Sequence, residues 1–170
     1  FVMPADAVAE LGDSGDLVLV SSPANPTGTV TPRETYQDLV ERGFRVISDE
    51  IYHGLVYSSI GEFTALEIDD DVIVVNGFSK RYAMTGFRLG WMIVPPRLVR
   101  PINRLAQNLF ISAPSLSQWA GIAALEHAGA WVEETRAEYL HRRDLLVGIL
   151  RELGFVIRRV PDGAFYVYAD

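Results

Sequence analysis

Cysteine is absent from this chain of 170 residues, and lysine occurs only once. Without cysteine there is no disulfide and no thiolate metal site, which is typical of a reducing compartment, so we expect a cytoplasmic protein. No apolar run approaches the roughly 18 residues that a membrane span needs, and no basic segment of a signal peptide opens the chain. Since Phe1 stands where an initiator Met is expected, we place the native start upstream.

The balance of charge excludes further classes of partner. The net charge is −7 and the pI is near 4.9, which argues against nucleic acid or an anionic membrane as the main partner. The 3 histidines form no pattern of metal ligands, so we expect no metal. Neither glycine-rich nucleotide-binding motif occurs. A hydrophobic content of 49% supports a packed core, and the length suits one domain, or one domain and part of another.

The single lysine, Lys80, follows an apolar run and a small Gly-Phe-Ser turn. Every other one of the 15 basic residues is arginine, which replaces lysine wherever only positive charge is needed. A guanidinium cannot form an imine, whereas a lysine amine can. Lys80 is therefore a candidate covalent nucleophile.

Apolar runs that alternate with turns and helical patterns predict an α/β fold with a mostly parallel sheet and flanking helices. The expected strands cover residues 17–20 (buried on both faces), 44–47, 72–75 and 87–94, with two further strands at 155–157 and 165–168. The expected helices cover residues 31–42, 101–126 with a break at 112–114, and 131–153. Thr31 and Glu34 are placed to form a capping box at the first helix.

Polar side chains follow the predicted strands at the points where they end. Asn25, Asp49, Tyr52 and Lys80 all lie just past strand ends. Ligands of parallel α/β sheets bind at the carboxyl ends of the strands. The sequence therefore predicts a site at this edge.

Five segments, in this order, carry a resemblance: S-P-A-N-P-T-G (22–28), S-D-E-I-Y (48–52), N-G-F-S-K (76–80), M-T-G-F-R-L-G-W (84–91) and P-D-G-A-F-Y (161–166). Together they resemble class I/II, fold-type I aminotransferases that depend on pyridoxal 5′-phosphate (PLP). The resemblance implies a partial PLP-binding large domain over residues 1–132. Residues 133–170 would then be an interdomain helix and the truncated start of a small α/β domain.

The resemblance also implies a role for each matching residue. Lys80 would form a Schiff base with PLP and then move the proton as general base. Asp49 would pair with the protonated ring nitrogen, while Asn25 and Tyr52 would donate to the 3′ oxygen. Arg88 would clamp the phosphate.

The phosphate contact of Ser79 is less defined. Some members of the family have Ser three residues before the lysine, where this chain has Gly77. Either the Ser79 hydroxyl or a backbone contact then serves the phosphate.

The implied reaction moves an amino group from an L-amino acid to a 2-oxo acid in a homodimeric, full-length enzyme of amino acid metabolism. The phosphate loop and the arginine for the substrate carboxylate have no counterpart here, so we expect a fragment that is inactive by itself and does not specify its substrates. One alternative is a PLP-dependent carbon–sulfur β-lyase, although such enzymes tend to carry His in place of Tyr52. Another is a non-catalytic, aminotransferase-like domain of a transcription regulator.

Overall fold

The computed structural model describes residues 17–57, 59 and 61–170. Four strands form one sheet in the order β1-β2-β3-β4, namely β1 (Leu17–Ser21), β2 (Arg45–Asp49), β3 (Ile73–Gly77) and β4 (Gly90–Ile93). The pairs β1–β2 and β2–β3 are parallel, and β4 is antiparallel to β3. The α/β fold with a mostly parallel sheet is confirmed.

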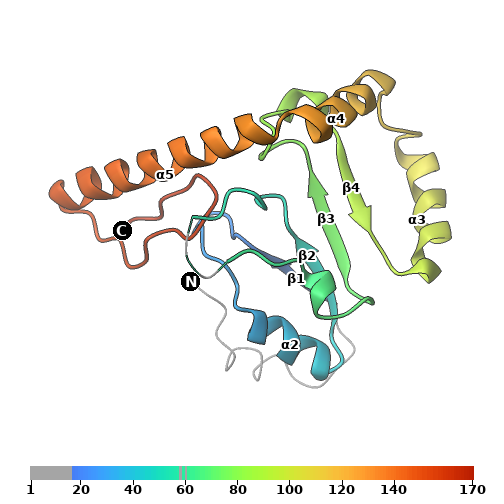
Figure 1. The fold of residues 1–170 in the computed structure, drawn as a ribbon. Helices are drawn as coiled ribbons and strands as arrows, with labels where there is room; N and C mark the ends of the chain where they lie inside the picture. Colours follow the sequence, from blue (N-terminus) through green and yellow to red (C-terminus); the bar gives the residue numbers. More distant parts are fainter. Residues whose placement is uncertain (1–16, 58, 60) are drawn as a thin grey trace.

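The helices flank this sheet (Figure 1). They are α2 (Arg33–Glu41), α3 (Pro96–Leu109), α4 (Ser115–His127) and α5 (Gly129–Glu152), with short 3₁₀ turns at Ala65–Glu67 and Thr85–Phe87. In Figure 1, α5 extends away from the sheet, and the C-terminal segment returns along it. The predicted helices and the break between α3 and α4 are confirmed, although α3 begins five residues earlier than expected, at Pro96.

The core lies between one face of the sheet and α2. Val20, Val46 and Val74 project from three neighbouring strands onto Tyr36 and Leu39 of α2, and all five are at most 5% exposed. Each fully buried side chain of this kind contributes about 1.5–3 kcal/mol. This packing fixes the ends of the strands, from which the candidate site is built.

The other face of β1 corrects one expectation. Leu17 and Leu19 are 58% and 66% exposed, so β1 is not buried on both faces. Successive side chains of a strand point to opposite faces, and within the described residues only the α2 side of β1 is covered. The all-apolar run predicted the strand correctly, but the prediction that both of its faces are buried was wrong.

The start of α2 corrects a second expectation. The N-cap is Pro32 and no side chain caps the helix, so Thr31 and Glu34 do not form the predicted capping box. The backbone N–H of Thr31 instead donates to the Ser22 hydroxyl at 3.0 Å, which ties Thr31 to the loop after β1. A capping box does form elsewhere, between Thr64 and Glu67.

The predicted strands at 155–157 and 165–168 are absent. Val156 and Asp170 exchange two backbone hydrogen bonds of 3.1 and 3.0 Å, and an isolated bridge joins Val56 to Gly163. A strand needs a continuous ladder, and these single pairings do not extend into one among the described residues.

Candidate active site

The end of β2 turns sharply at Asp49, which presents two predicted site residues. An oxygen of the Asp49 carboxylate accepts the Ile51 backbone N–H at 3.1 Å. The turn brings Tyr52 into the interior, where it is 3% exposed, whereas Asp49 is half-buried. Asp49 lies close enough for its charge to help raise the Tyr52 pKa.

The buried carboxyl group of Glu50 holds this turn in place. Oε1 accepts from the Ser48 hydroxyl at 3.1 Å, the Thr64 hydroxyl at 3.1 Å and the Ala65 backbone N–H at 2.8 Å. Oε2 lies 3.2 Å from Nδ1 of His53. Buried polar groups are costly unless paired, and this one is paired at both oxygens. The turn is therefore pre-organised by the chain itself.

Three polar groups meet beside this turn: Asn25, Tyr52 and Tyr166. The Asn25 amide nitrogen donates to the Tyr166 hydroxyl at 3.3 Å, and the hydroxyls of Tyr52 and Tyr166 are 2.5 Å apart. Burial is the largest cause of a Tyr52 pKa well above its ordinary value. Tyr52 is consequently a neutral phenol that can donate at physiological pH.

Tyr166 reaches this position because residues 161–164 dock on the loop after β1. The Gly28 carbonyl accepts the backbone N–H groups of Asp162 and Gly163 at 2.8 and 2.9 Å. Gly28 has φ +66°, and a Cβ there would lie 2.6 Å from Cβ of Pro161, so only glycine fits. The Ala164 N–H donates to the Leu55 carbonyl at 2.9 Å, which ties the same segment to the turn after β2.

Lys80 follows β3, with its amine against two aromatic rings. Its Nζ lies 5.9 Å from the ring centroid of Tyr52 and 5.7 Å from that of Phe165. Among the described residues, the structure gives this amine no carboxylate within ion-pair distance. Lys80, Tyr52 and Asn25 are thus brought together as the sequence predicted.

Ser79 and Arg88 are joined through Thr85 in the loop after β3. The Thr85 hydroxyl donates to the Ser79 carbonyl at 3.0 Å, and Nη1 of Arg88 donates to the Thr85 carbonyl at 2.9 Å. Arg88 is exposed and has φ +49°. Thr85 therefore links the two residues, and no hydrogen bond of theirs to Asn25, Asp49 or Tyr52 is found in the described part of the chain.

Gly77 has a physical reason to replace the serine of some family members. A Cβ at this position would lie 3.1 Å from the Leu89 carbonyl oxygen and 3.2 Å from Cα of Gly90, both in the backbone that pairs with β3. These contacts are tighter than ordinary van der Waals distances. The close approach of β4 thus favours glycine here.

The family follows from comparison with known proteins. The profile of the family described as Aminotransferase class I and II matches residues 5–170. The chain belongs to this family. Its members depend on PLP.

Named relatives are similar along the whole chain. The valine–pyruvate aminotransferase of Mycobacterium tuberculosis is 43% identical over 176 residues, which covers 100% of this chain and 45% of the relative. The (5-formylfuran-3-yl)methyl phosphate transaminase of Methanocaldococcus jannaschii is 40% identical over 164 residues, covering 94% of this chain and 44% of the relative. The chain spans less than half the length of these relatives.

Solved structures agree on the fold. A mutant aspartate aminotransferase of Thermus thermophilus superposes with a TM-score of 0.92 at 35% identity, over 100% of this chain and 46% of that chain. A Methanococcus jannaschii protein, described as similar in its active site to kynurenine aminotransferases, gives 0.90 at 38% identity, over 98% and 46%.

The residues at the strand ends fit PLP in their chemistry. An amine, a carboxylate and two hydrogen-bond donors are the groups that a PLP site requires, and Lys80, Asp49, Asn25 and Tyr52 supply them. In the described residues there is no cluster of His, Asp or Glu suited to a metal. No helix in that part of the chain is both long and apolar enough to cross a membrane.

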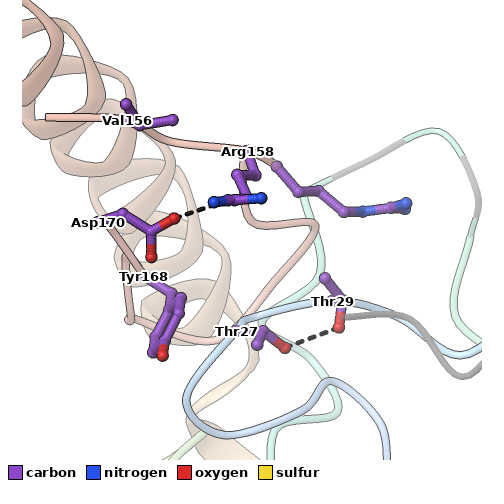
Figure 2. Close-up of a pocket in the computed structure, with 7 residues that line it drawn as sticks. Thr27, Thr29, Val156, Arg158, Tyr168 and Asp170 are labelled. Atoms are coloured by element: carbon purple, nitrogen blue, oxygen red, sulfur yellow. Dashed lines mark hydrogen bonds and ion pairs between the residues drawn. The ribbon is translucent and has the colours of Figure 1, made fainter.

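Figure 2 shows a small hollow whose lining includes none of the predicted site residues. It is lined by Thr27 and Thr29 of the loop after β1 and by residues of the C-terminal segment such as Arg158 and Tyr168. Its volume is about 10 Å³, enough for one water molecule at most. It cannot hold a cofactor. The predicted site residues Asn25, Asp49 and Lys80 instead follow β1, β2 and β3.

The predicted set of site residues missed Phe165, Tyr166 and Thr85. The P-D-G-A-F-Y motif contains the two aromatics, but no periodicity in the sequence says that they return to Tyr52. Thr85 stands inside a recognised motif, and only the fold shows that its hydroxyl and carbonyl link Ser79 to Arg88.

Proposed function

We propose that the full-length protein containing this chain transfers an amino group from an L-amino acid to a 2-oxo acid, with PLP attached at Lys80. The observation that carries the proposal is the single lysine, whose amine lies 5.9 Å from the centroid of the Tyr52 ring. When bound, PLP supplies an electron sink for the negative charge that develops at the substrate α-carbon. Residues of this chain would hold PLP and move the proton of the substrate α-carbon.

Each residue has a defined task in this proposal. Lys80 holds the cofactor covalently and, once released, carries the proton from the α-carbon as general base. The Asp49 carboxylate keeps the ring nitrogen protonated by charge pairing. Tyr52 and Asn25 donate to the 3′ oxygen.

We assign the binding of the cofactor phosphate to Arg88 and Ser79. Arg88 presents a guanidinium fork on an exposed loop, and guanidinium groups bind phosphate in a bidentate manner. Ser79 adds its hydroxyl or its backbone N–H. Because Thr85 links the two residues, we propose that they act as one unit.

The names of the relatives support amino-group transfer over β-lyase chemistry or a regulatory domain, since they are aminotransferases. The remaining proposals are a homodimer in the cytoplasm, free of nucleic acid and membrane and acting in amino acid metabolism. They also include a division into a large-domain part (1–132) and a small-domain part (133–170). The family resemblance supports them.

The test is reductive trapping in the full-length protein. Borohydride treatment with PLP, followed by peptide mass mapping, should place a pyridoxyl adduct on Lys80. Lys80→Arg keeps the charge but cannot form an imine, so it should abolish the adduct and lower transamination at least about 10³-fold. An adduct spread over other amines, or full activity in Lys80→Arg, would contradict the proposal.

A further inference from the structure

Tyr166 is the group at this site to which the proposed function gives no task. Its hydroxyl has two partners, the Asn25 amide nitrogen at 3.3 Å and the Tyr52 hydroxyl at 2.5 Å. Both partners are the groups assigned above to the cofactor's 3′ oxygen. The Tyr166 hydroxyl therefore joins the two proposed donors by hydrogen bonds.

The donors and acceptors limit the order of these bonds. An amide nitrogen only donates, so the Tyr166 oxygen accepts from Asn25. The Tyr166 proton is then available for the Tyr52 oxygen, and the Tyr52 proton is left for a further acceptor. In the opposite order, Tyr52 would donate to Tyr166, and Tyr166 would carry the outward proton.

The task proposed for Tyr52 selects the first order, because only that order leaves the Tyr52 proton for the cofactor's 3′ oxygen. The Lys80 amine lies 5.9 Å from the Tyr52 ring and 5.7 Å from the Phe165 ring. A ligand anchored at this amine is therefore adjacent to Tyr52. In the first order, the Tyr52 proton is the one left to bond such a ligand.

We propose that Tyr166 is a positioning residue: its hydroxyl completes a chain of hydrogen bonds, Asn25 to Tyr166 to Tyr52, that turns the Tyr52 proton toward an anionic ligand oxygen. The proposal rests on the proposed function, because PLP supplies that oxygen. A hydroxyl that accepts one hydrogen bond donates the next more strongly. Tyr166 thus strengthens the hydrogen bond from Tyr52 without touching the ligand.

The backbone keeps the Tyr166 hydroxyl in place. The docked segment just before Tyr166 is tied to two loops, with the Gly163 N–H donating to the Gly28 carbonyl and the Ala164 N–H to the Leu55 carbonyl, each at 2.9 Å. The Tyr57 hydroxyl also donates to the Ala164 carbonyl at 2.6 Å. A rigid support of this kind suits a group whose only task is to orient another.

The ring and the hydroxyl of Tyr166 can be separated by mutation. The ring packs edge-on against Tyr52, with centroids 5.6 Å apart. Tyr52 has a second edge-on contact with Phe165 at 5.5 Å. Tyr166→Phe therefore removes the hydroxyl and retains the packing.

The experiment is a pH titration of the cofactor's visible absorption band in the full-length protein loaded with PLP. Donation to the 3′ oxygen lowers the pKa read from this band, so Tyr166→Phe should raise that pKa by about half a unit to one unit, as expected for one weakened hydrogen bond. Tyr52→Phe should raise it further. The double variant should match Tyr52→Phe alone, because Tyr166 acts only through Tyr52. Tyr168→Phe, the same change two residues away at the hollow of Figure 2, should leave the pKa unchanged.

An unchanged pKa in Tyr166→Phe, or additive shifts in the double variant, would overturn the inference. A wild-type protein that never develops the visible band refutes the proposed function instead. In that event a cofactor-free measurement still tests the contact. The ¹³Cζ resonance of Tyr52 should move on Tyr166→Phe and stay on Tyr168→Phe, and a Tyr52 signal that does not respond overturns the chain of hydrogen bonds.

Discussion

The turn after β2 and the loop after β3 both carry proposed cofactor ligands, yet the chain supports them very differently. In the turn, Glu50 is 3% exposed and uses both oxygens to hold neighbouring groups. In the loop, Arg88 is exposed, and its side chain donates to the Thr85 carbonyl. The turn after β2 is held by hydrogen bonds to a buried carboxyl group, whereas Arg88 is held by a bond to nearby backbone.

The difference teaches which part of the site is formed before any ligand arrives. A pre-organised donor loses little entropy on binding, whereas an exposed arginine must be ordered by its ligand. We therefore expect mutations in the turn to act on stability and mutations in the loop to act on cofactor affinity. Three changes test this, in order of decreasing effect on stability.

Glu50→Ala should have the largest effect on stability. It leaves the Ser48 and Thr64 hydroxyls and the Ala65 N–H without their acceptor, and such losses sum to about 3 kcal/mol. Hydrogen exchange over residues 48–66 of the full-length protein should accelerate accordingly. Glu50→Gln, which keeps one acceptor oxygen, should lose about 1 kcal/mol. If both variants exchange like the wild type, the turn does not depend on this carboxyl group.

Tyr36 of α2, which contacts Ser48 at the end of β2, provides a pH-dependent test of stability near the turn. Its hydroxyl lies 3.1 Å from the Ser48 hydroxyl, and burial is the largest cause of a Tyr36 pKa raised to about 12. The unfolded chain loses this proton near pH 10 and the folded chain later. The stabilisation is therefore complete below pH 10 and is lost as the pH rises from 10 to 12, at about 1.4 kcal/mol per unit.

The measurement compares the free energy of unfolding of the wild type and Tyr36→Phe across that window. The variant has no proton to lose, so its curve should be flatter between pH 10 and 12. Because the other titrating groups are common to both proteins, the difference isolates Tyr36. Parallel curves would mean that Tyr36 titrates alike in the folded and unfolded chains.

The same comparison explains what the sequence could predict. Asn25, Asp49, Tyr52 and Lys80 could be placed because each follows an apolar run, and parallel strands end at one edge of a sheet. Tyr166 could not be placed, since its position depends on backbone bonds to Gly28 across more than 130 residues. Local patterns carry no information about such pairings.

The errors in the fold have a related cause. The capping box at Thr31 failed because Ser22, nine residues earlier, takes the Thr31 N–H. The strand at Leu17–Val20 was predicted correctly, but the exposure of Leu17 and Leu19 depends on what covers the sheet. In each case the outcome depends on the tertiary surroundings of the segment, which a local sequence pattern does not describe.

Arg88→Ala should have the smallest effect on stability and a clear effect on binding. Exposed substitutions change stability by at most about 0.5 kcal/mol, so the unfolding midpoint of the cofactor-free protein should stay the same. Loss of a charged hydrogen bond to phosphate should weaken PLP affinity about 10- to 100-fold, as measured by equilibrium titration. Arg104→Ala, which removes an exposed arginine from α3, should change neither quantity. If Arg88→Ala instead destabilises the cofactor-free protein as much as Glu50→Ala, the loop is as pre-organised as the turn, and the contrast between the two regions is wrong.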